Sequence, residues 1–242
     1  INLVLESREV AKKDKTKIMS ALSQYAKLGK KSRLRDVISE QRLREIKVEE
    51  LTQKVKDLLQ LPHEIFFYGK DFEAFKTNAE NFVEKSTLQI PEPRIFDEPE
   101  TQGKVYFTDY DMVQVEMSKI GRAHQVNPKN YGKINVFNEY FGRGLSSIVF
   151  QELRESKSLA YSAYVSYSNA NLLNKHDYLV TYIGTQTNKL HLAVEAMDEL
   201  MKDLPRVNAQ FENAKNSALK QIAPTRVTKP NIFFNYLNLN RL

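Results

Sequence analysis

Arg154 and Tyr161 lie seven residues apart, where a predicted helix passes into a predicted strand. A guanidinium is a rigid fork of N–H donors that can bind the carbonyl oxygens of a peptide. A phenol can donate a hydrogen bond to an oxygen whose negative charge develops only in the transition state, as in the tetrahedral intermediate of peptide hydrolysis. These residue types are therefore able to bind a carbonyl oxygen and to stabilise an oxyanion, but their types and spacing alone do not assign them either role.

An ordinary structural role is the alternative for both residues. Arg154 could pair with the nearby acids Glu152 or Glu155. Tyr161 could pack within a strand, where aromatic residues are common. Residue type and spacing leave both interpretations open.

Self-contained catalytic or metal-binding motifs are missing from the sequence. There is no cysteine, which excludes disulfides, thiolate metal sites and cysteine nucleophiles within the chain. The four histidines contain no i, i+4 pair, and neither H-E-x-x-H nor H-x-x-E-H occurs. His63 is followed by Glu64, but on a predicted strand these side chains point to opposite faces. We therefore predict that no residue of this chain binds a metal ion.

The glycine-containing segment GRGLSS, residues 142–147, has a structural interpretation. It lacks the lysine and the G-x-x-x-x-G-K-[ST] spacing of a phosphate-binding loop, and it is not a G-x-S-x-G nucleophile elbow. We interpret it as an interruption between two helices, where glycine permits a tight turn or the close approach of another backbone.

The net charge of +6 is concentrated in the first quarter of the chain. Residues 1–60 hold 15 lysines and arginines against 9 aspartates and glutamates, whereas residues 61–242 hold 21 of each kind. The acids alternate with the bases at helical spacing, which is typical of a solvated helix face. No aromatic platform for stacking bases accompanies the lysines. We therefore predict no nucleic-acid partner.

Hydrophobic periodicity predicts an α+β fold, with helices packed on largely antiparallel sheets. Helices are predicted over 18–28, 33–46, 47–61, 71–83, 135–140, 147–153, 188–204 and 208–222. Strands are predicted at 63–70, in two extended runs within 104–117, and at 159–167 and 177–185. Prolines among polar and acidic residues predict a linker at 85–100.

No n-region or h-region of a secretory signal is visible in the sequence, which indicates nothing about the compartment of the protein. Ile1 stands inside an apolar run, so we expect the chain to be a piece of a longer protein. No apolar stretch approaches the ~20 residues of a membrane span, and we predict no membrane partner.

The stretch NEYFGRGLSSIVFQELRESKSLAYSAYVSY, residues 138–167, resembles the C-terminal-half signature of the pitrilysin/insulinase family of zinc metallopeptidases, the inverzincins. The matching parts come in order: an aromatic helix ending in Y-F-G-x-G, a turn of small residues, a helix with F-Q-E-L-R-E, and L-A-Y opening a strand. A weaker resemblance covers residues 20–70, 105–117 and 233–242. The chain looks most like the large bacterial single-chain peptidases, whose two halves are joined by a linker and enclose a chamber.

The resemblance implies that this chain is the C-terminal half of such a peptidase. Residues 1–84 would be the C-terminal part of the penultimate peptidase-like domain and residues 85–100 the linker. Residues 101–242 would be the final domain, truncated at its C-terminus. Zinc would be bound by H-x-x-E-H and a distal glutamate in the N-terminal half of the same polypeptide, which is the implied partner.

The same resemblance implies a role for the two candidate residues. In the family, an arginine and a tyrosine with this spacing face the zinc site from across the chamber, and Arg154 and Tyr161 match them. Tyr161 would be catalytic, as a donor to the oxyanion or substrate carbonyl, and both residues would bind substrate. The implied function is the substrate-binding, chamber-closing half of a metalloendopeptidase that cuts peptides or small unfolded proteins, and this fragment alone would be inactive.

Two other functions stay open. The family includes paralogues that have lost their zinc ligands and serve as scaffolds, and a basic nucleic-acid-binding module would rest only on the charge excess of residues 1–60. Upstream sequence with H-x-x-E-H would favour the enzyme. We expect a soluble bacterial protein of the periplasm or cytoplasm, but the residues do not indicate its compartment, cleavage preference or oligomeric state.

Overall fold

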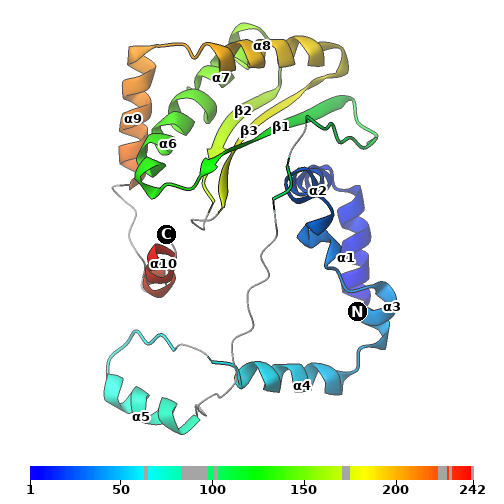
Figure 1. The fold of residues 1–242 in the computed structure, drawn as a ribbon, viewed down its shortest axis with the longest axis vertical. Helices are drawn as coiled ribbons and strands as arrows, with labels where there is room; N and C mark the ends of the chain where they lie inside the picture. The colour runs from blue at the N-terminus through cyan, green and yellow to red at the C-terminus, as the bar shows by residue number, and fades with distance from the viewer. Residues whose placement is uncertain are drawn as a thin grey trace. The chain divides into compact units, whose positions relative to one another are not determined.

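The chain forms two compact units, residues 1–104 and residues 105–242 (Figure 1). The structure is a computed structural model. It describes residues 1–62, 65–82, 98–100, 103–170, 175–222, 228 and 231–240. In this part of the chain, none of the helices combines the length and the apolar character needed to cross a membrane.

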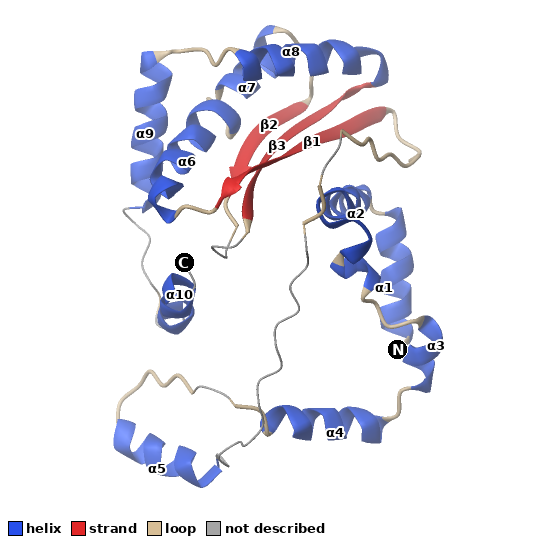
Figure 2. Cartoon of the chain, viewed as in Figure 1, coloured by secondary structure: helices blue, strands red, loops and turns tan. Residues whose placement is uncertain are grey.

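The described residues of the first unit are helical or irregular (Figure 2). Its helices are α1 Asn2–Lys13, α2 Lys15–Leu28, α3 Glu40–Glu45, α4 Val48–Leu59 and α5 Phe72–Phe82. The side chain of Asp14 caps α2 by accepting hydrogen bonds from the amides of Thr16 and Lys17. Gly29 ends α2 with a φ of +55°, which confirms the predicted helix end.

Two predictions for the first unit differ from the structure. Of the helix predicted over 33–46, only α3 forms as an α-helix, and it begins after Ser39, whose hydroxyl accepts from the amide of Arg42. The predicted buried strand at 63–70 is wrong where the structure describes it, because residues 65–70 are irregular and Ile65 is 51% exposed. An extended segment needs a neighbouring strand to pair its amides, and the described part of this unit has none. Residues 63–64, and residues 85–97 of the predicted linker, lie outside the described residues.

The second unit contains an antiparallel sheet, which confirms the predicted α+β fold class (Figure 2). Its strands are β1 Gln114–Gln125, β2 Ser162–Ser168 and β3 His176–Gln186, in the order β1-β3-β2. The earlier of the two extended runs predicted within 104–117 does not form a strand. Pairing starts at Gln114 opposite Gln186, where β3 ends, so β3 has no residues beyond this point to pair with the preceding segment, in which Phe107 is 83% exposed.

The described helices of the second unit are α6 Tyr131–Phe137, α7 Ile148–Phe150, α8 Leu190–Lys202, α9 Asn208–Ile222 and α10 Asn231–Asn240. Two helical segments of the second unit are longer than the sequence pattern predicts, whereas α8 is shorter than predicted and α9 has the predicted bounds. α6 continues into a π-helical turn, Asn138–Gly142, and α7 continues into another, Gln151–Ser156. Figure 1 shows α6, α7 and α8 over the sheet.

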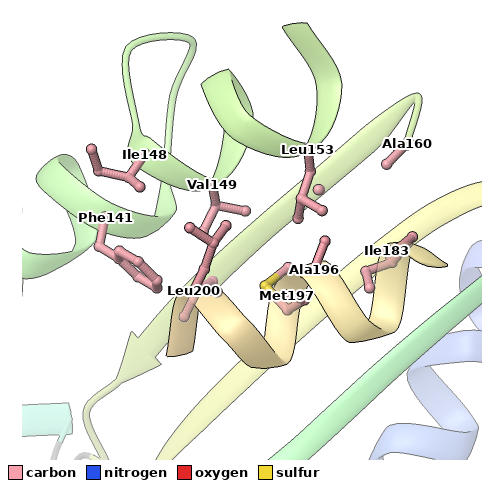
Figure 3. Packing of buried hydrophobic residues seen from close by; sticks show 12 residues of the cluster. Phe141, Ile148, Val149, Leu153, Ala160, Ile183, Ala196, Met197 and Leu200 are labelled. Atoms are coloured by element: carbon pink, nitrogen blue, oxygen red, sulfur yellow. The ribbon is translucent and has the colours of Figure 1, made fainter. Parts of the chain in front are cut away.

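The hydrophobic core of the second unit lies between these helices and one face of the sheet. Figure 3 shows Val149 and Leu153 facing Ala196 and Met197 of α8. Among the described residues, the largest fully buried apolar side chains are Phe141, Leu153, Ile183, Val149 and Val165. Burying a side chain of this size stabilises the fold by roughly 1.5–3 kcal/mol.

The interruption between the two helical segments is held tightly against the edge strand β2. The side-chain amide of Asn138 donates to the carbonyl of Tyr167 at 2.9 Å and its side-chain oxygen accepts from the Tyr167 amide at 2.8 Å. A Cβ atom on Gly142 would lie 1.8 Å from the carbonyl oxygen of Val165. Gly144 has a φ of +85°. The segment is therefore both a close backbone approach and a tight turn, as predicted.

We expect Gly142→Ala to lower the free energy of unfolding by about 3 kcal/mol, because the new methyl group would overlap the backbone of β2. Gly132→Ala in α6 is the matched control, since its Cβ would meet nothing within 4 Å. That variant should be neutral or more stable by up to ~1 kcal/mol. Urea denaturation measures both, and equal midpoints for the two variants would contradict the proposed contact.

Candidate functional site

Arg154 and Tyr161 line the same depression on the surface of the second unit. Its volume is about 280 Å³. Arg154 comes from the π-helical turn after α7, and Tyr161 directly precedes β2. The lining residues are Arg154, Ser158, Leu159, Ala160, Tyr161, Thr185, Gln186 and Lys189.

The chain between these two residues is a compact junction anchored by backbone hydrogen bonds. The carbonyl of Leu153 accepts from the amides of Leu159, at 2.8 Å, and Ala160, at 3.2 Å. Ser158 turns the chain with a φ of +50°, a left-handed conformation that is unusual for a residue other than glycine. The Tyr161 amide then donates to the carbonyl of Gly184 at 2.9 Å, which joins the junction to β3.

The phenol of Tyr161 is accessible and held from one side. Tyr161 is 50% exposed. The side-chain amide of Gln186 donates to the Tyr161 hydroxyl oxygen at 2.8 Å. Because a hydroxyl both accepts and donates, the phenolic proton is left to donate to another group. The hydroxyl is thus positioned by β3 while its donor capacity stays open.

The guanidinium of Arg154 lies over the Phe150 ring, 4.9 Å from its centroid. Its Nε is 3.6 Å from Oε1 of Glu155, and both side chains are about half exposed. This distance is too long for a good hydrogen bond, and an exposed ion pair of this kind contributes little to stability. The expected pairing with a neighbouring acid therefore involves Glu155, but it is loose, and Arg154 still lines the depression.

No sequence pattern indicates the other polar residues of the depression. Gln186 and Thr185 end β3, and Lys189 follows in the short turn before α8. The Thr185 hydroxyl is buried and donates to the carbonyl of Leu159 at 2.5 Å. The Lys189 ammonium donates to the carbonyl of Ser158 at 3.1 Å. These residues reach the junction because β3 is paired with β2, a relation that spacing along the chain does not reveal.

A metal site does not form among the described residues, which contain no group of three or more His, Cys, Asp or Glu side chains that could hold an ion. Three of the histidines lie on different elements: His124 is on β1, His176 is at the start of β3 and His191 is on α8. His63 and Glu64 lie outside the described residues. The described side chains thus do not fit a zinc ion.

A pair of tyrosines lies on the sheet face opposite the core. The rings of Tyr164 and Tyr182 stack with their centroids 4.9 Å apart. Burial, together with the nearby carboxylate of Glu116, raises the pKa of Tyr182 to about 12. The phenol of Tyr182 therefore stays neutral at physiological pH, and the stacked pair lies outside the depression.

Comparisons with known proteins point to peptidases. The family model described as the peptidase M16 inactive domain matches residues 46–217. An uncharacterized zinc protease of Bacillus subtilis, YmxG, is 35% identical over 83 residues, which is 33% of this chain and 20% of that protein.

Two solved structures share the fold. The peptidase M16 inactive domain from Pseudomonas fluorescens matches 99% of this chain and 58% of its own, with a TM-score of 0.62 and 13% identity. A protease from Helicobacter pylori matches 84% of this chain and 51% of its own, with a TM-score of 0.56 and 15% identity. This chain thus spans between half and three fifths of these two structures and one fifth of the curated relative.

The strained turn at the junction can be tested through stability. Ser158→Gly should be neutral or should stabilise the protein by up to about 1 kcal/mol, because glycine adopts a φ of +50° without strain. Ser156→Gly, in the preceding helical turn, is the control and should destabilise by about 0.5–1 kcal/mol. Denaturation midpoints measure the difference, and a larger loss at residue 158 than at residue 156 would contradict the interpretation.

Proposed function

Because this chain belongs to the peptidase M16 inactive-domain family, we propose that it forms the substrate-binding, chamber-closing half of a zinc-dependent metalloendopeptidase. The substrates would be peptides or small unfolded proteins. The domain assignments of residues 1–84, 85–100 and 101–242 are part of the same proposal. The family membership rests on the match over residues 46–217.

One observation carries the proposal for the site: Arg154 and Tyr161 line one depression, and both side chains are about half exposed. The contacts of these two side chains leave part of their hydrogen-bonding capacity for a ligand. Among the described residues, Arg154 has a loose ion pair with Glu155, and the Tyr161 hydroxyl accepts a hydrogen bond from Gln186. A peptide carbonyl placed in the depression could therefore receive hydrogen bonds from both.

The chemical role of Tyr161 is to stabilise negative charge on an oxygen of the substrate. When a peptide carbonyl is attacked, its oxygen becomes an oxyanion, and a donor that is already in place strengthens its hydrogen bond as the charge develops. Gln186 holds the phenol in position, so little reorganisation is needed at that step. Arg154 would orient the peptide by binding a neighbouring carbonyl through its planar fork.

The metal and the general base belong to a different part of the proposed enzyme. No described group of this chain fits a zinc ion, so we assign the zinc site to the N-terminal half of the same polypeptide. Zinc bound there would supply a Lewis acid and an activated water. The residues of this chain would bind and orient the peptide, and this chain alone would cut nothing.

We expect Tyr161→Phe to lower the kcat of the full-length protein at least tenfold, because loss of one oxyanion donor typically costs ~10² to 10³ in rate. The readout is cleavage of a quenched, unstructured peptide with zinc present. Tyr236→Phe removes the same hydroxyl from an exposed position on α10 and should leave cleavage unchanged.

The assay contains its own controls for the proposed chemistry. A chelator should abolish cleavage, and this chain alone should show none. If Tyr161→Phe has the same kcat as the wild-type protein, the proposed catalytic role of the tyrosine is wrong. If the full-length protein binds no zinc and cleaves no peptide, the proposed peptidase function is wrong and a scaffold function is favoured.

A further inference from the structure

The depression contains a second cationic side chain, Lys189, that the proposed reaction does not use. We propose that Lys189 and Arg154 make the depression a subsite for a carboxylate of the bound peptide. The protein would then prefer peptides with an acidic group close to the carbonyl that Tyr161 contacts. This inference rests on the proposed function, since it assumes that the ligand is a peptide.

The charge of the lining residues supports a subsite for anions. The lining set contains two cations and no carboxylate, and its other polar members, among them Thr185 and Gln186, are neutral. Glu155 is the acid that approaches Arg154, and it is not part of the lining. A ligand in the depression therefore meets a net positive charge, partly reduced by Glu155.

The hydrogen bonding of Lys189 leaves capacity for a ligand. An ammonium group has three N–H donors. Within the described ranges, Lys189 makes one hydrogen bond, to the neutral carbonyl of Ser158 at 3.1 Å, and has no acidic partner. That contact holds the ammonium at the rim of the junction, where its two remaining donors are available to a carboxylate. Charge-assisted hydrogen bonds of this kind are stronger than neutral ones.

A purely structural role for Lys189 is the alternative. Its bond to Ser158 supports a residue with a φ of +50°, so its removal could disturb the turn that carries Tyr161. Such a disturbance would weaken the binding of every peptide by the same factor. Recognition of a carboxylate would instead weaken acidic peptides selectively and spare neutral ones. The selectivity between matched peptides therefore separates the two roles.

The test compares matched fluorescent peptides by their Kd for the full-length protein, measured by anisotropy with a chelator present to prevent cleavage. One neutral, C-terminally amidated peptide carries a single Gln, and a series replaces it with Glu at successive positions. A further peptide keeps Gln and has a free C-terminal carboxylate. The two acidic forms distinguish a side-chain carboxylate from a chain end as the source of the anion.

We expect the best-placed acidic peptide to bind about three- to tenfold more tightly than its neutral counterpart. Lys189→Gln should remove most of this preference with little effect on the neutral peptide, and Lys189→Arg should retain it. Lys202→Gln, which removes an exposed charge from the other end of α8, is the control and should change neither Kd.

Equal affinity of the wild-type protein for acidic and neutral peptides would overturn the inference. A uniform loss of affinity for all peptides in Lys189→Gln would overturn it as well, in favour of a structural role. If a chelator abolishes cleavage but Lys189→Gln does not change the ratio of Kd values for acidic and neutral peptides, the proposed function is supported and the carboxylate subsite is contradicted. If Lys189→Gln reduces the preference for acidic peptides but the full-length protein cleaves no peptide, the carboxylate subsite is supported and the peptidase function is contradicted.

Discussion

The close approach of the Gly142 backbone to Val165 is the constraint on which the rest of the second unit depends. A side chain at residue 142 would hold the helix away from the edge of the sheet. With glycine there, the Asn138 side chain can bond both backbone groups of Tyr167. The helical segment and β2 are thus placed against each other, and the core side chains of α7 and α8 are packed over the sheet.

The candidate site is a consequence of that packing. Leu153 is fully buried, and its carbonyl accepts hydrogen bonds from the amides of Leu159 and Ala160. The chain must therefore turn back towards the sheet immediately after the helix. The strained Ser158 makes that turn. One residue on each side of it, Arg154 and Tyr161, then borders the same depression. A hydrophobic contact in the core therefore sets the positions of polar groups on the surface.

Elements whose residues carry a strong local signal could be predicted from the sequence, including β2 and β3, but whether an extended segment finds a pairing partner could not. Gly29 marks a helix end that depends on backbone geometry, and α2 and α4 form close to where they are expected. Residues 65–70 have the composition of a strand, yet they are irregular in the structure because a strand also requires a neighbour. The apolar segment at 104–111 stays irregular for the same reason, since β3 ends at Gln186.

The sequence by itself determined the helix-to-strand setting of Arg154 and Tyr161 and the glycines that interrupt the helices, because these depend on residue type and short spacing, whereas the pairing of the two residues in one site was implied only by the family resemblance. The tertiary structure alone decided which residues accompany that pair. Gln186 and Lys189 are 25 and 28 residues beyond Tyr161 and reach the depression through the pairing of β3 with β2. Strand register is set by packing and by hydrogen bonds between distant segments, so local sequence patterns do not contain it.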